Sequence, residues 1–193
     1  MTDSNPESWR TFCAIELPEE ICARATQRIN DLKLSFPNSN ASWNRDGRYH
    51  LTLKFIGEIP QSRVKRLSLA ASRAVAELSP FAIVVEQSGV FPAHGPPRIL
   101  WIGVNDISGS LTELHARLED ECSREGFPKE DRPYHPHLTL ARLRKPQGAR
   151  SLASAHRELW FGPTEVRVSE LLVIRSELST VGSKYSVISR HQL

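Results

Sequence analysis

The sequence predicts an α+β protein built from two similar lobes that face each other. Segments with the periodicity of strands alternate with segments with the periodicity of helices along the 193 residues. The four-residue phrase His-Leu-Thr-Leu occurs twice, at positions 50–53 and 137–140, each time in a predicted strand of its own half. No low-complexity linker separates the halves, so we expect residues 1–193 to form a single domain.

The first half is predicted to contain a strand, a helix, a strand and a helix. Pro18 suits the first position of a helix, and apolar residues then recur at steps of three or four before Pro37. The strand that carries the first phrase is expected to follow a turn at Asp46-Gly47 and to stop at Gly57. The predicted elements are strand 10–17, helix 18–36, strand 49–56 and helix 64–78, after a loose start at residues 1–8.

The second half is predicted to contain most of the strands. The Pro-rich segment 91–97 must be a loop between two runs of β-branched residues. Ser-Leu-Thr-Glu at 110–113 has the form of a capping box at the start of a helix, and Gly-Ser at 182–183 is typical of a hairpin connection. The predicted elements are strands 81–85 and 99–104, a helix from Ser110 that stops at Gly126, strand 137–143, helix 149–159, and strands 166–174 and 185–189.

The composition is that of an ordinary globular protein, with 39% hydrophobic and 24% charged residues. No run of about eighteen or more apolar residues occurs, and the first residues are neither basic nor apolar, so we expect no membrane span and no secretory signal. Three cysteines without a CxxC pair indicate reduced thiols in a cytoplasmic protein rather than a zinc site. We expect a monomer that needs no cofactor.

Basic residues are concentrated around the second phrase, although the formal net charge is only +3. Residues 132–157 contain no Asp or Glu. This segment is either a solvated basic face or a site for phosphate. Its basic side chains are Arg132, Arg142, Arg144, Lys145, Arg150 and Arg157.

Each copy of the phrase places a proton-transferring group and a hydroxyl on one face of a strand. Because alternate side chains of a strand point the same way, His50 and Thr52 should project together. The same holds for His137 and Thr139. Two histidines can serve as acid and base in the hydrolysis of a phosphodiester, while hydroxyls and a nearby Arg bind the phosphate oxygens, and this scheme needs no metal. The alternatives are ordinary buried strands with hydrogen-bonded histidines, or a metal site that includes His135 and His137.

The two phrases and their flanking residues resemble the paired His-x-Thr motifs of the two-histidine phosphoesterases. They are closest to the branch of RNA 2′,3′-cyclic phosphodiesterases, whose older name is 2′-5′ RNA ligase. The motif sequences are HLTLKFIGE at 50–58 and HPHLTLAR at 135–142. The likeness extends from the strand at 10–15 to the segments at 175–178 and 182–185, so it covers nearly the whole chain.

This resemblance implies a bilobal α+β fold, with two pseudo-symmetric lobes of antiparallel sheet, helices packed outside and an active cleft between the sheets. The implied activity is metal-independent hydrolysis of a 2′,3′-cyclic phosphate, at an RNA end or in a cyclic nucleotide, to a 2′-phosphomonoester. The implied roles are a proton donor at His50, a proton acceptor at His137, and phosphate-binding groups at Thr52, Thr139 and Arg142. Ligation through a 2′-5′ linkage, hydrolysis of a small cyclic phosphate, and RNA binding without catalysis remain as alternatives.

The orientation of two further side chains depends on how regular the motif strands are. Arg142 lies five positions after His137, so strict alternation puts it on the opposite face, and its role requires a bend, a bulge or a strand end near Ala141. Lys54 has the right parity to face the cleft, with an ordinary exposed lysine as the alternative. The aromatic residues that flank the motifs, either as base-stacking or as packing groups, are Trp43, Tyr49 and Tyr134.

Overall fold

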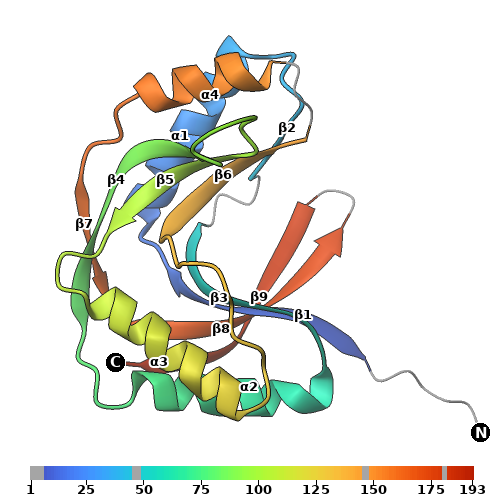
Figure 1. Cartoon of the computed structure of the whole chain (residues 1–193), viewed down its shortest axis with the longest axis vertical. Helices are drawn as coiled ribbons and strands as arrows, with labels where there is room; N and C mark the ends of the chain where they lie inside the picture. Colours follow the sequence, from blue (N-terminus) through green and yellow to red (C-terminus); the bar gives the residue numbers. More distant parts are fainter. Residues whose placement is uncertain (1–6, 45–48, 145–147, 180–181) are drawn as a thin grey trace, which may run out of the picture.

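The computed structural model describes residues 7–44, 49–144, 148–179 and 182–193. These residues form two antiparallel sheets and four helices, and two helices pack against the outer face of each sheet (Figure 1). One sheet lies above the other in Figure 1, so the chain has an upper and a lower lobe. The predicted α+β fold with two lobes is confirmed.

The lower sheet combines the beginning of the chain with its end. Its strand order is β3-β1-β8-β9, and all neighbouring strands are antiparallel. The strand that carries the first phrase, β3, therefore lies at an edge. Strands β8 and β9 form the predicted hairpin, but Gly182 and Ser183, predicted as its connection, are the first residues of β9 and pair with β8. The strands are β1 (Ser8–Glu16), β3 (His50–Pro60), β8 (Glu170–Ser179) and β9 (Gly182–Gln192).

The upper sheet has the order β2-β6-β5-β4-β7, again with antiparallel neighbours. The second phrase lies in β6, which covers the predicted residues. Strand β4 is longer than predicted, because Gln87 adopts a φ of 65° at a register shift and lets the strand continue to Phe91. The strands are β2 (Ala41–Trp43), β4 (Phe81–Phe91), β5 (Ile99–Asn105), β6 (His137–Leu143) and β7 (Thr164–Val168).

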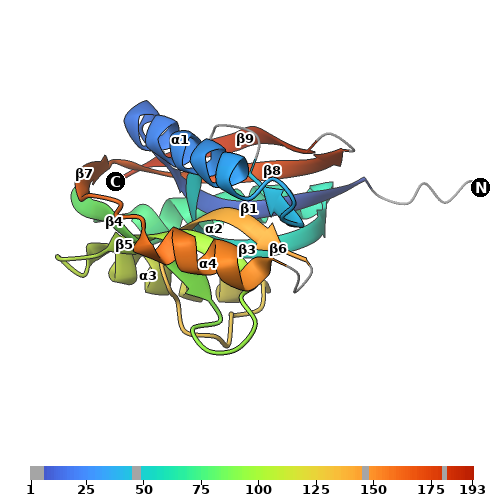
Figure 2. The same cartoon turned by 90° about the horizontal axis from the view of Figure 1, so that it is seen from above.

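Two helices cross from the lobe of the preceding strand to the other lobe. Helix α1 follows β1 of the lower sheet but packs on the upper sheet, where Arg28 donates a 2.9 Å hydrogen bond to Ser88 of β4. Helix α3 follows β5 of the upper sheet and packs on β3 of the lower sheet. The order β1-α1-β3-α2 is thus repeated as β5-α3-β6-α4, and Figure 2 shows α1 and α4 on the same side of the molecule. The helices are α1 (Glu19–Ser35), α2 (Gln61–Val75), α3 (Ser110–Arg124) and α4 (Ala149–Glu158).

The core lies between the helices and the sheets, where the apolar stripes of both meet. The predicted apolar positions of α1 and α3 are all at most 2% exposed, which confirms the periodicity on which these helices were predicted. These positions are Ile21, Ala25, Ile29 and Leu32 in α1, and Leu111, Leu114, Leu118 and Cys122 in α3.

Among the other strand boundaries that differ from the prediction, two do so because of features that the sequence pattern does not reveal. Strand β3 does not stop at Gly57, because this glycine adopts a φ of 85° and still pairs with Thr11, so the strand continues to Pro60. The predicted strand 166–174 is two strands, because the chain leaves the upper sheet and joins the lower sheet at Ser169.

The predicted capping box at 110–113 is not formed. The N-cap of α3 is Gly109, which has a φ of 76° and no side chain to accept a hydrogen bond. Instead, the carboxylate of Asp106 accepts hydrogen bonds from the amides of Leu111 and Thr112, at 3.2 and 2.8 Å. An acidic side chain outside the helix therefore satisfies the free amides of its first turn.

Some predicted features fall outside the described residues. These are residues 1–6 of the loose start, the turn at Asp46-Gly47, and Lys145 of the basic segment. The last two residues of the predicted loose start are ordered, because β1 begins at Ser8 and the carbonyl of Glu7 accepts a 2.9 Å hydrogen bond from the amide of Gln61.

The cysteines are unpaired, as predicted: Cys13 and Cys122 are buried and Cys22 is half-buried. Burial raises the pKa of Cys13, and it raises the pKa of Cys122 to about 12, so both thiols stay protonated and pack as apolar side chains. In the described part of the chain, no helix has the length and apolar character that crossing a membrane requires.

Candidate active site

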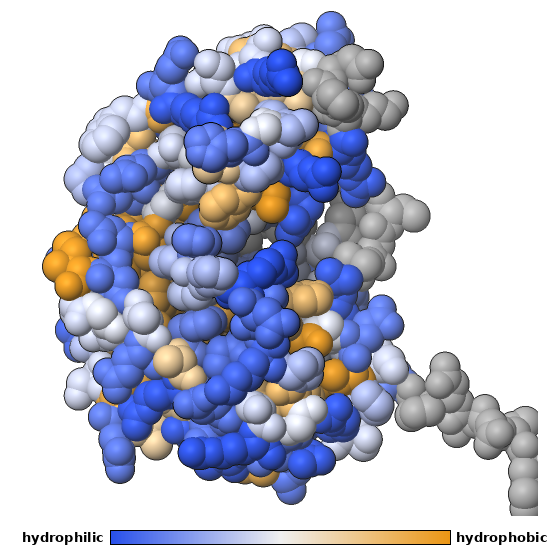
Figure 3. Space-filling model, viewed as in Figure 1, coloured by the Kyte–Doolittle hydropathy of each residue, from blue (hydrophilic) through white to orange (hydrophobic). Residues whose placement is uncertain are grey.

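The two motif strands face each other across the space between the lobes. Strand β3 forms the edge of the lower sheet, β6 lies next to the short edge strand of the upper sheet, and the two strands contact each other. The surface in Figure 3 is hollowed between the lobes, and mostly hydrophilic residues surround the hollow. We use the term cleft face for the side of each sheet that is turned away from its helices.

The first phrase has the predicted orientation. The two leucines of the phrase are buried in the core, whereas His50 and Thr52 are half-buried on the cleft face. After Thr52 the pairing with β1 shifts by one residue, so Leu53 and Lys54 are both buried on the side of the helices. Both alternatives predicted for Lys54 are therefore wrong: it does not face the cleft, and it is not an ordinary exposed lysine, because the residue is 4% exposed.

The second phrase has the same geometry as the first, including a register shift after its threonine. His137 and Thr139 are half-buried on the cleft face. The pairing of β6 with β5 shifts at Leu140, so that Leu140 and Ala141 are both buried and Arg142 returns to the cleft face, where it is exposed. The bulge that a role of Arg142 requires is thus present.

The two bulges put Phe55 and Arg142 at equivalent positions, each five residues after the motif histidine. Phe55 is 52% exposed, and the guanidinium carbon of Arg10 lies 4.7 Å from its ring centroid, which is within the range of a cation–π contact. Each lobe therefore presents one arginine next to its motif. The sequence pattern did not indicate Arg10, because its ring partner lies in another strand.

His50 lies against two aromatic rings of the lower sheet. The centroid of its imidazole is 4.7 Å from that of Phe12 and 4.9 Å from that of Tyr185. Burial against these rings lowers the pKa of His50 from 6.5 to about 4, because an apolar environment disfavours the imidazolium. In the free protein this ring is therefore neutral at neutral pH.

His137 is held by the backbone just before its strand. Its Nδ1 lies 2.6 Å from the carbonyl oxygen of His135, and since a carbonyl only accepts, Nδ1 must donate the hydrogen. The neutral ring then has its lone pair on Nε2. Burial lowers the pKa of His137, and the positive charge of Arg142 acts in the same direction. A neutral imidazole with a free Nε2 is suited to removing a proton.

The groups predicted to bind phosphate are available to a ligand. Neither the hydroxyl of Thr52 nor that of Thr139 has a hydrogen-bond partner in the described part of the chain. Arg142 is exposed, and it forms no ion pair with any described residue. Two hydroxyl donors and one guanidinium without a partner among the described residues are thus available to an anion on the cleft face.

The metal alternative has no support among the described residues. No group of three or more His, Cys, Asp or Glu side chains in these ranges is arranged to hold a metal ion. His135 is exposed, and the Nδ1 of His137 is used by a backbone carbonyl. The predicted pair of histidine ligands therefore lacks a third ligand in this part of the chain.

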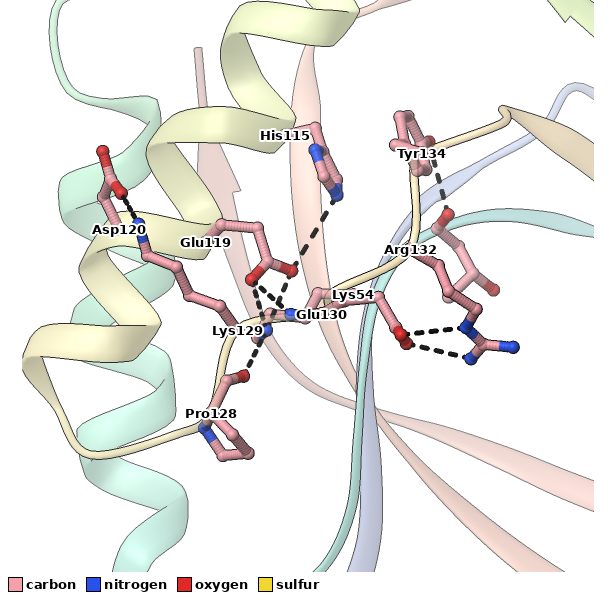
Figure 4. A network of polar contacts seen from close by, with 10 residues as sticks. Lys54, His115, Glu119, Asp120, Pro128, Lys129, Glu130, Arg132 and Tyr134 are labelled. Carbon is pink, nitrogen blue, oxygen red and sulfur yellow. Dashed lines mark hydrogen bonds and ion pairs between the residues drawn. The ribbon is translucent and has the colours of Figure 1, made fainter.

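A buried ion pair attaches the segment that leads into β6 to the lower lobe. The Nζ of Lys54 lies 2.8 and 2.7 Å from the two carboxylate oxygens of Glu119 in α3 (Figure 4). The same ammonium donates a 2.8 Å hydrogen bond to the carbonyl of Pro128. Lys54 thus connects β3, α3 and the approach to β6.

Tyr134 also connects the approach to β6 with α3 and β3. Its ring stacks on that of His115 in α3, with 4.0 Å between the centroids, and its hydroxyl donates a 3.3 Å hydrogen bond to the carbonyl of Thr52 (Figure 4). Tyr134 is therefore a packing aromatic, and so is Tyr49, which is 2% exposed. Trp43 is half-buried at the edge of the upper sheet.

Trp101 lies flat across the neighbouring strand at Gly89. A Cβ at Gly89 would be 2.1 Å from Cζ2 of Trp101, so we expect Gly89→Ala to displace the indole and to lower the free energy of unfolding by about 1–3 kcal/mol. Urea denaturation measures this loss. The control is Gly162→Ala, whose Cβ would meet the 70% exposed side chain of Trp160, which is free to move. Equal stabilities of the two variants would contradict the tight packing at Gly89.

Comparisons with known proteins relate this geometry to a family. Residues 17–180 match the family model described as the 2′-5′ RNA ligase superfamily. An RNA 2′,3′-cyclic phosphodiesterase from Thermotoga maritima is 31% identical over 180 residues, which cover 93% of this chain and 92% of that protein. A second protein of this name, from Methanothermobacter thermautotrophicus, is 30% identical over 178 residues, which cover 92% and 95%.

Solved structures agree with the sequence comparison. TT0787 of Thermus thermophilus superimposes with a TM-score of 0.79 at 26% identity, covering 95% of this chain and 97% of that chain. Escherichia coli LigT complexed with 3′-AMP superimposes with a TM-score of 0.72 at 26% identity, covering 97% and 99%. Sequence and fold are thus shared over nearly the whole length. The chain belongs to the 2′-5′ RNA ligase superfamily.

Proposed function

We propose that this protein hydrolyses RNA 2′,3′-cyclic phosphate ends to 2′-phosphomonoesters. The observation that carries the proposal is the pair of His-x-Thr strands, each with an imidazole on the cleft face and a hydroxyl that has no hydrogen-bond partner in the described ranges. The relatives named RNA 2′,3′-cyclic phosphodiesterase support the substrate class. Two proton-transferring groups on facing strands are what this hydrolysis needs, because one must activate water while the other protonates the leaving oxygen.

In the proposed reaction, water attacks the cyclic phosphorus while the bond from phosphorus to the 3′ oxygen breaks. The Nε2 of His137 accepts a proton from the water, because its lone pair is free. His50 gives a proton to the departing oxygen, so the product has a 3′-hydroxyl and a 2′-phosphate. Thr52 and Thr139 donate hydrogen bonds to the non-bridging oxygens, and Arg142 offsets their growing charge. The direction of proton flow follows the family resemblance, and the tautomer of His137 supports it.

The proton-donating role requires a protonated His50, although burial holds its pKa at about 4 in the free protein. A bound cyclic phosphate brings a negative charge to the cleft. This charge favours the imidazolium form and raises the pKa of His50. In our proposal, substrate binding therefore supplies the acid with its proton.

The pH dependences of kcat and kcat/KM are expected to differ. The active form has His137 neutral and His50 protonated, so activity should fall on both sides of a pH optimum that the pKa values of these two groups set. Because kcat/KM reports the free protein and kcat the complex, in which the pKa of His50 is raised above about 4, the alkaline limb of kcat should lie at higher pH. Initial rates on a cyclic nucleotide from acid to neutral pH measure both. Coincident alkaline limbs would mean that the substrate does not raise this pKa.

The substrate class can be tested with an RNA oligonucleotide that ends in a 2′,3′-cyclic phosphate. It is incubated with the protein in the presence of EDTA, which removes free metal ions. We expect conversion to a 2′-phosphate end, identified by phosphorus NMR. Addition of an oligonucleotide with a free 5′-hydroxyl reveals ligation, as a longer product with a 2′-5′ linkage. Tight binding of the RNA without change of the cyclic end would instead favour a non-catalytic RNA-binding protein. Dependence on an added metal would contradict the metal-independent scheme.

A further inference from the structure

We propose that Arg10 and Ser176 form a second phosphate subsite, which binds the phosphodiester that precedes the cyclic end of the RNA. The two residues pair across β1 and β8 of the lower sheet. This inference rests on the proposed function, because that function places the cyclic phosphate between His50 and His137. The subsite distinguishes the end of an RNA chain from a single cyclic nucleotide, which has no such phosphodiester.

Strand β1 presents Arg10 to the cleft. The pairing of β1 with β8 is regular from Arg10 to Ala14, so alternate side chains of this stretch share a face. Phe12 and Ala14 belong to a small apolar cluster apart from the main core, and the ring of Phe12 lies 4.7 Å from that of His50. Arg10, two residues before Phe12, therefore lies on the cleft face, about 7 Å further along the strand.

The guanidinium of Arg10 is turned toward the first motif. The residue opposite Arg10 in β3 is Glu58, which is exposed. The guanidinium carbon lies instead 4.7 Å from the ring centroid of Phe55, which is three residues nearer to the motif. Arg10 is half-buried, and its guanidinium forms no ion pair or hydrogen bond with any residue that the structure describes. An aromatic ring thus holds the cation, while its N–H groups stay available to an anion.

Ser176 places a hydroxyl next to Arg10 on the cleft face. The two residues pair directly, so their side chains project from the same face of the sheet. Ser176 is 8% exposed, and its hydroxyl has no hydrogen-bond partner within the described ranges. An arginine and a hydroxyl are also what the upper lobe presents at Arg142 and Thr139. Both groups donate hydrogen bonds, so together they suit the oxygen atoms of a phosphate.

The subsite lies where the RNA chain is expected to continue. In the proposed reaction His50 protonates the 3′ oxygen, so the terminal ribose lies against the lower sheet. The 5′ oxygen of this ribose carries the preceding phosphodiester, which is one nucleotide away from the cyclic phosphate. The rings of Phe12 and Tyr185, 5.6 Å apart, cover the sheet next to His50, and Arg10 follows Phe12 along β1. Arg10 therefore meets the next negative charge of the chain.

The experiment compares two dinucleotides with the same 2′,3′-cyclic end, joined either by a phosphodiester or by an uncharged methylphosphonate. The first ribose of both carries a 2′-O-methyl group, which keeps the linkage from cleaving itself. For the wild-type protein we expect kcat/KM to be higher on the phosphodiester by on the order of 10-fold. Arg10→Met should bring this ratio close to one, and Arg10→Lys, which keeps the charge, should restore it in part. Ser176→Ala should lower the ratio severalfold.

Arg175→Met is the matched control. This arginine lies in β8, and its guanidinium carbon is also placed over an aromatic ring, 4.4 Å from the centroid of Trp9. Trp9 packs against the main core, so this pair lies on the helix side of the same sheet. Removal of this charge should leave the ratio of the two dinucleotides as it is in the wild-type protein.

The salt dependence of kcat/KM on a longer RNA end gives a second measurement, which a purely structural role of Arg10 would not change. Each contact with a phosphate of a single strand contributes about 0.7 to the slope of the logarithm of affinity against the logarithm of salt concentration. Arg10→Met should therefore make the slope of kcat/KM shallower by up to about 0.7, whereas Arg175→Met should not. Equal slopes in Arg10→Met and the wild-type protein would contradict a phosphate contact.

The outcomes separate the subsite from the proposed function. A wild-type ratio near one would overturn the subsite while the hydrolysis stands, and so would equal falls on both dinucleotides in Arg10→Met. Turnover of neither dinucleotide by the wild-type protein would overturn the proposed hydrolysis. Calorimetric titration with the two dinucleotides would then test the subsite alone. Tighter binding of the phosphodiester, lost in Arg10→Met, would support the subsite, whereas equal affinities would refute it.

Discussion

Replacement of either motif histidine by alanine is expected to lower kcat on a cyclic phosphate end by about 10²–10⁴-fold. Each change removes one of the two proton-transferring groups, while the hydroxyls of the motifs still bind the phosphate. Loss of both groups should cost less than the product of the single losses, because they act in one step. Initial rates of His50→Ala and His137→Ala measure the effect. His94→Ala, in an exposed loop, is the matched control and should keep full activity.

A second substrate distinguishes the donor from the acceptor. If the 3′ oxygen is replaced by sulfur, the leaving thiolate is stable without a proton, so the acid is no longer needed. The His50→Ala variant should then recover most of its lost rate, whereas His137→Ala should remain slow. The reverse pattern would exchange the two roles. Wild-type rates from either alanine variant on the normal substrate would remove both histidines from the mechanism.

The elements that could be predicted from the sequence are those that local periodicity defines. The apolar positions of α1 and α3 are buried as predicted, and β6 has the predicted residues. The exchange of α1 and α3 between the lobes could not be predicted, because periodicity shows which face of a helix is buried but not against which sheet. The break between β7 and β8 at Ser169 could not be predicted either, because the apolar pattern continues through it while the pairing partner changes from β4 to β1.

The site was predictable up to the point where the strands become irregular. Two-residue alternation placed both histidines and both threonines on the cleft face. The bulge directly after each motif then reversed the alternation, which brought Arg142 onto that face and took Lys54 away from it. The bulges depend on pairing with β1 and β5, which a single strand does not encode. The aromatic rings beside the histidines come from strands distant in the sequence, so no local pattern indicated them.

The catalytic roles proposed for the two histidines rest on the geometry of the cleft and on the family resemblance. The expectation of a cytoplasmic monomer without a cofactor stays a prediction.

The basic segment around the second phrase, residues 132–157, contributes Arg142 to the cleft face, where this side chain is exposed. The other described arginines of that segment are Arg132, Arg144, Arg150 and Arg157, and Arg132 pairs with Glu130 at 2.9 Å. The described part of the segment is therefore in part a solvated basic face, and the binding of phosphate by Arg142 stays a proposal.

Lys54→Met is expected to destabilise the protein by about 3–5 kcal/mol, because it leaves the buried carboxylate of Glu119 without its cation. The two side chains are 3% and 10% exposed, so water does little to replace the lost ammonium. The midpoint and slope of urea denaturation give the free energy of unfolding. The control is Lys129→Met, which breaks an ion pair with Asp120 whose side chains are 54% and 58% exposed. This change should cost less than about 1 kcal/mol.

The double variant Lys54→Met/Glu119→Leu shows which part of the network supplies the stability. If the loss in the single variant comes from the orphaned carboxylate, removal of both charges should restore most of the free energy of unfolding, because apolar side chains fill the space. The carbonyl of Pro128 would still lack its donor, and the amide of Glu130 would lose the carboxylate of Glu119 as its acceptor, so a residual loss of about 1–3 kcal/mol is expected. A double variant as unstable as Lys54→Met would instead mean that the ammonium, which joins β3 to the approach to β6, stabilises the packing of the two lobes.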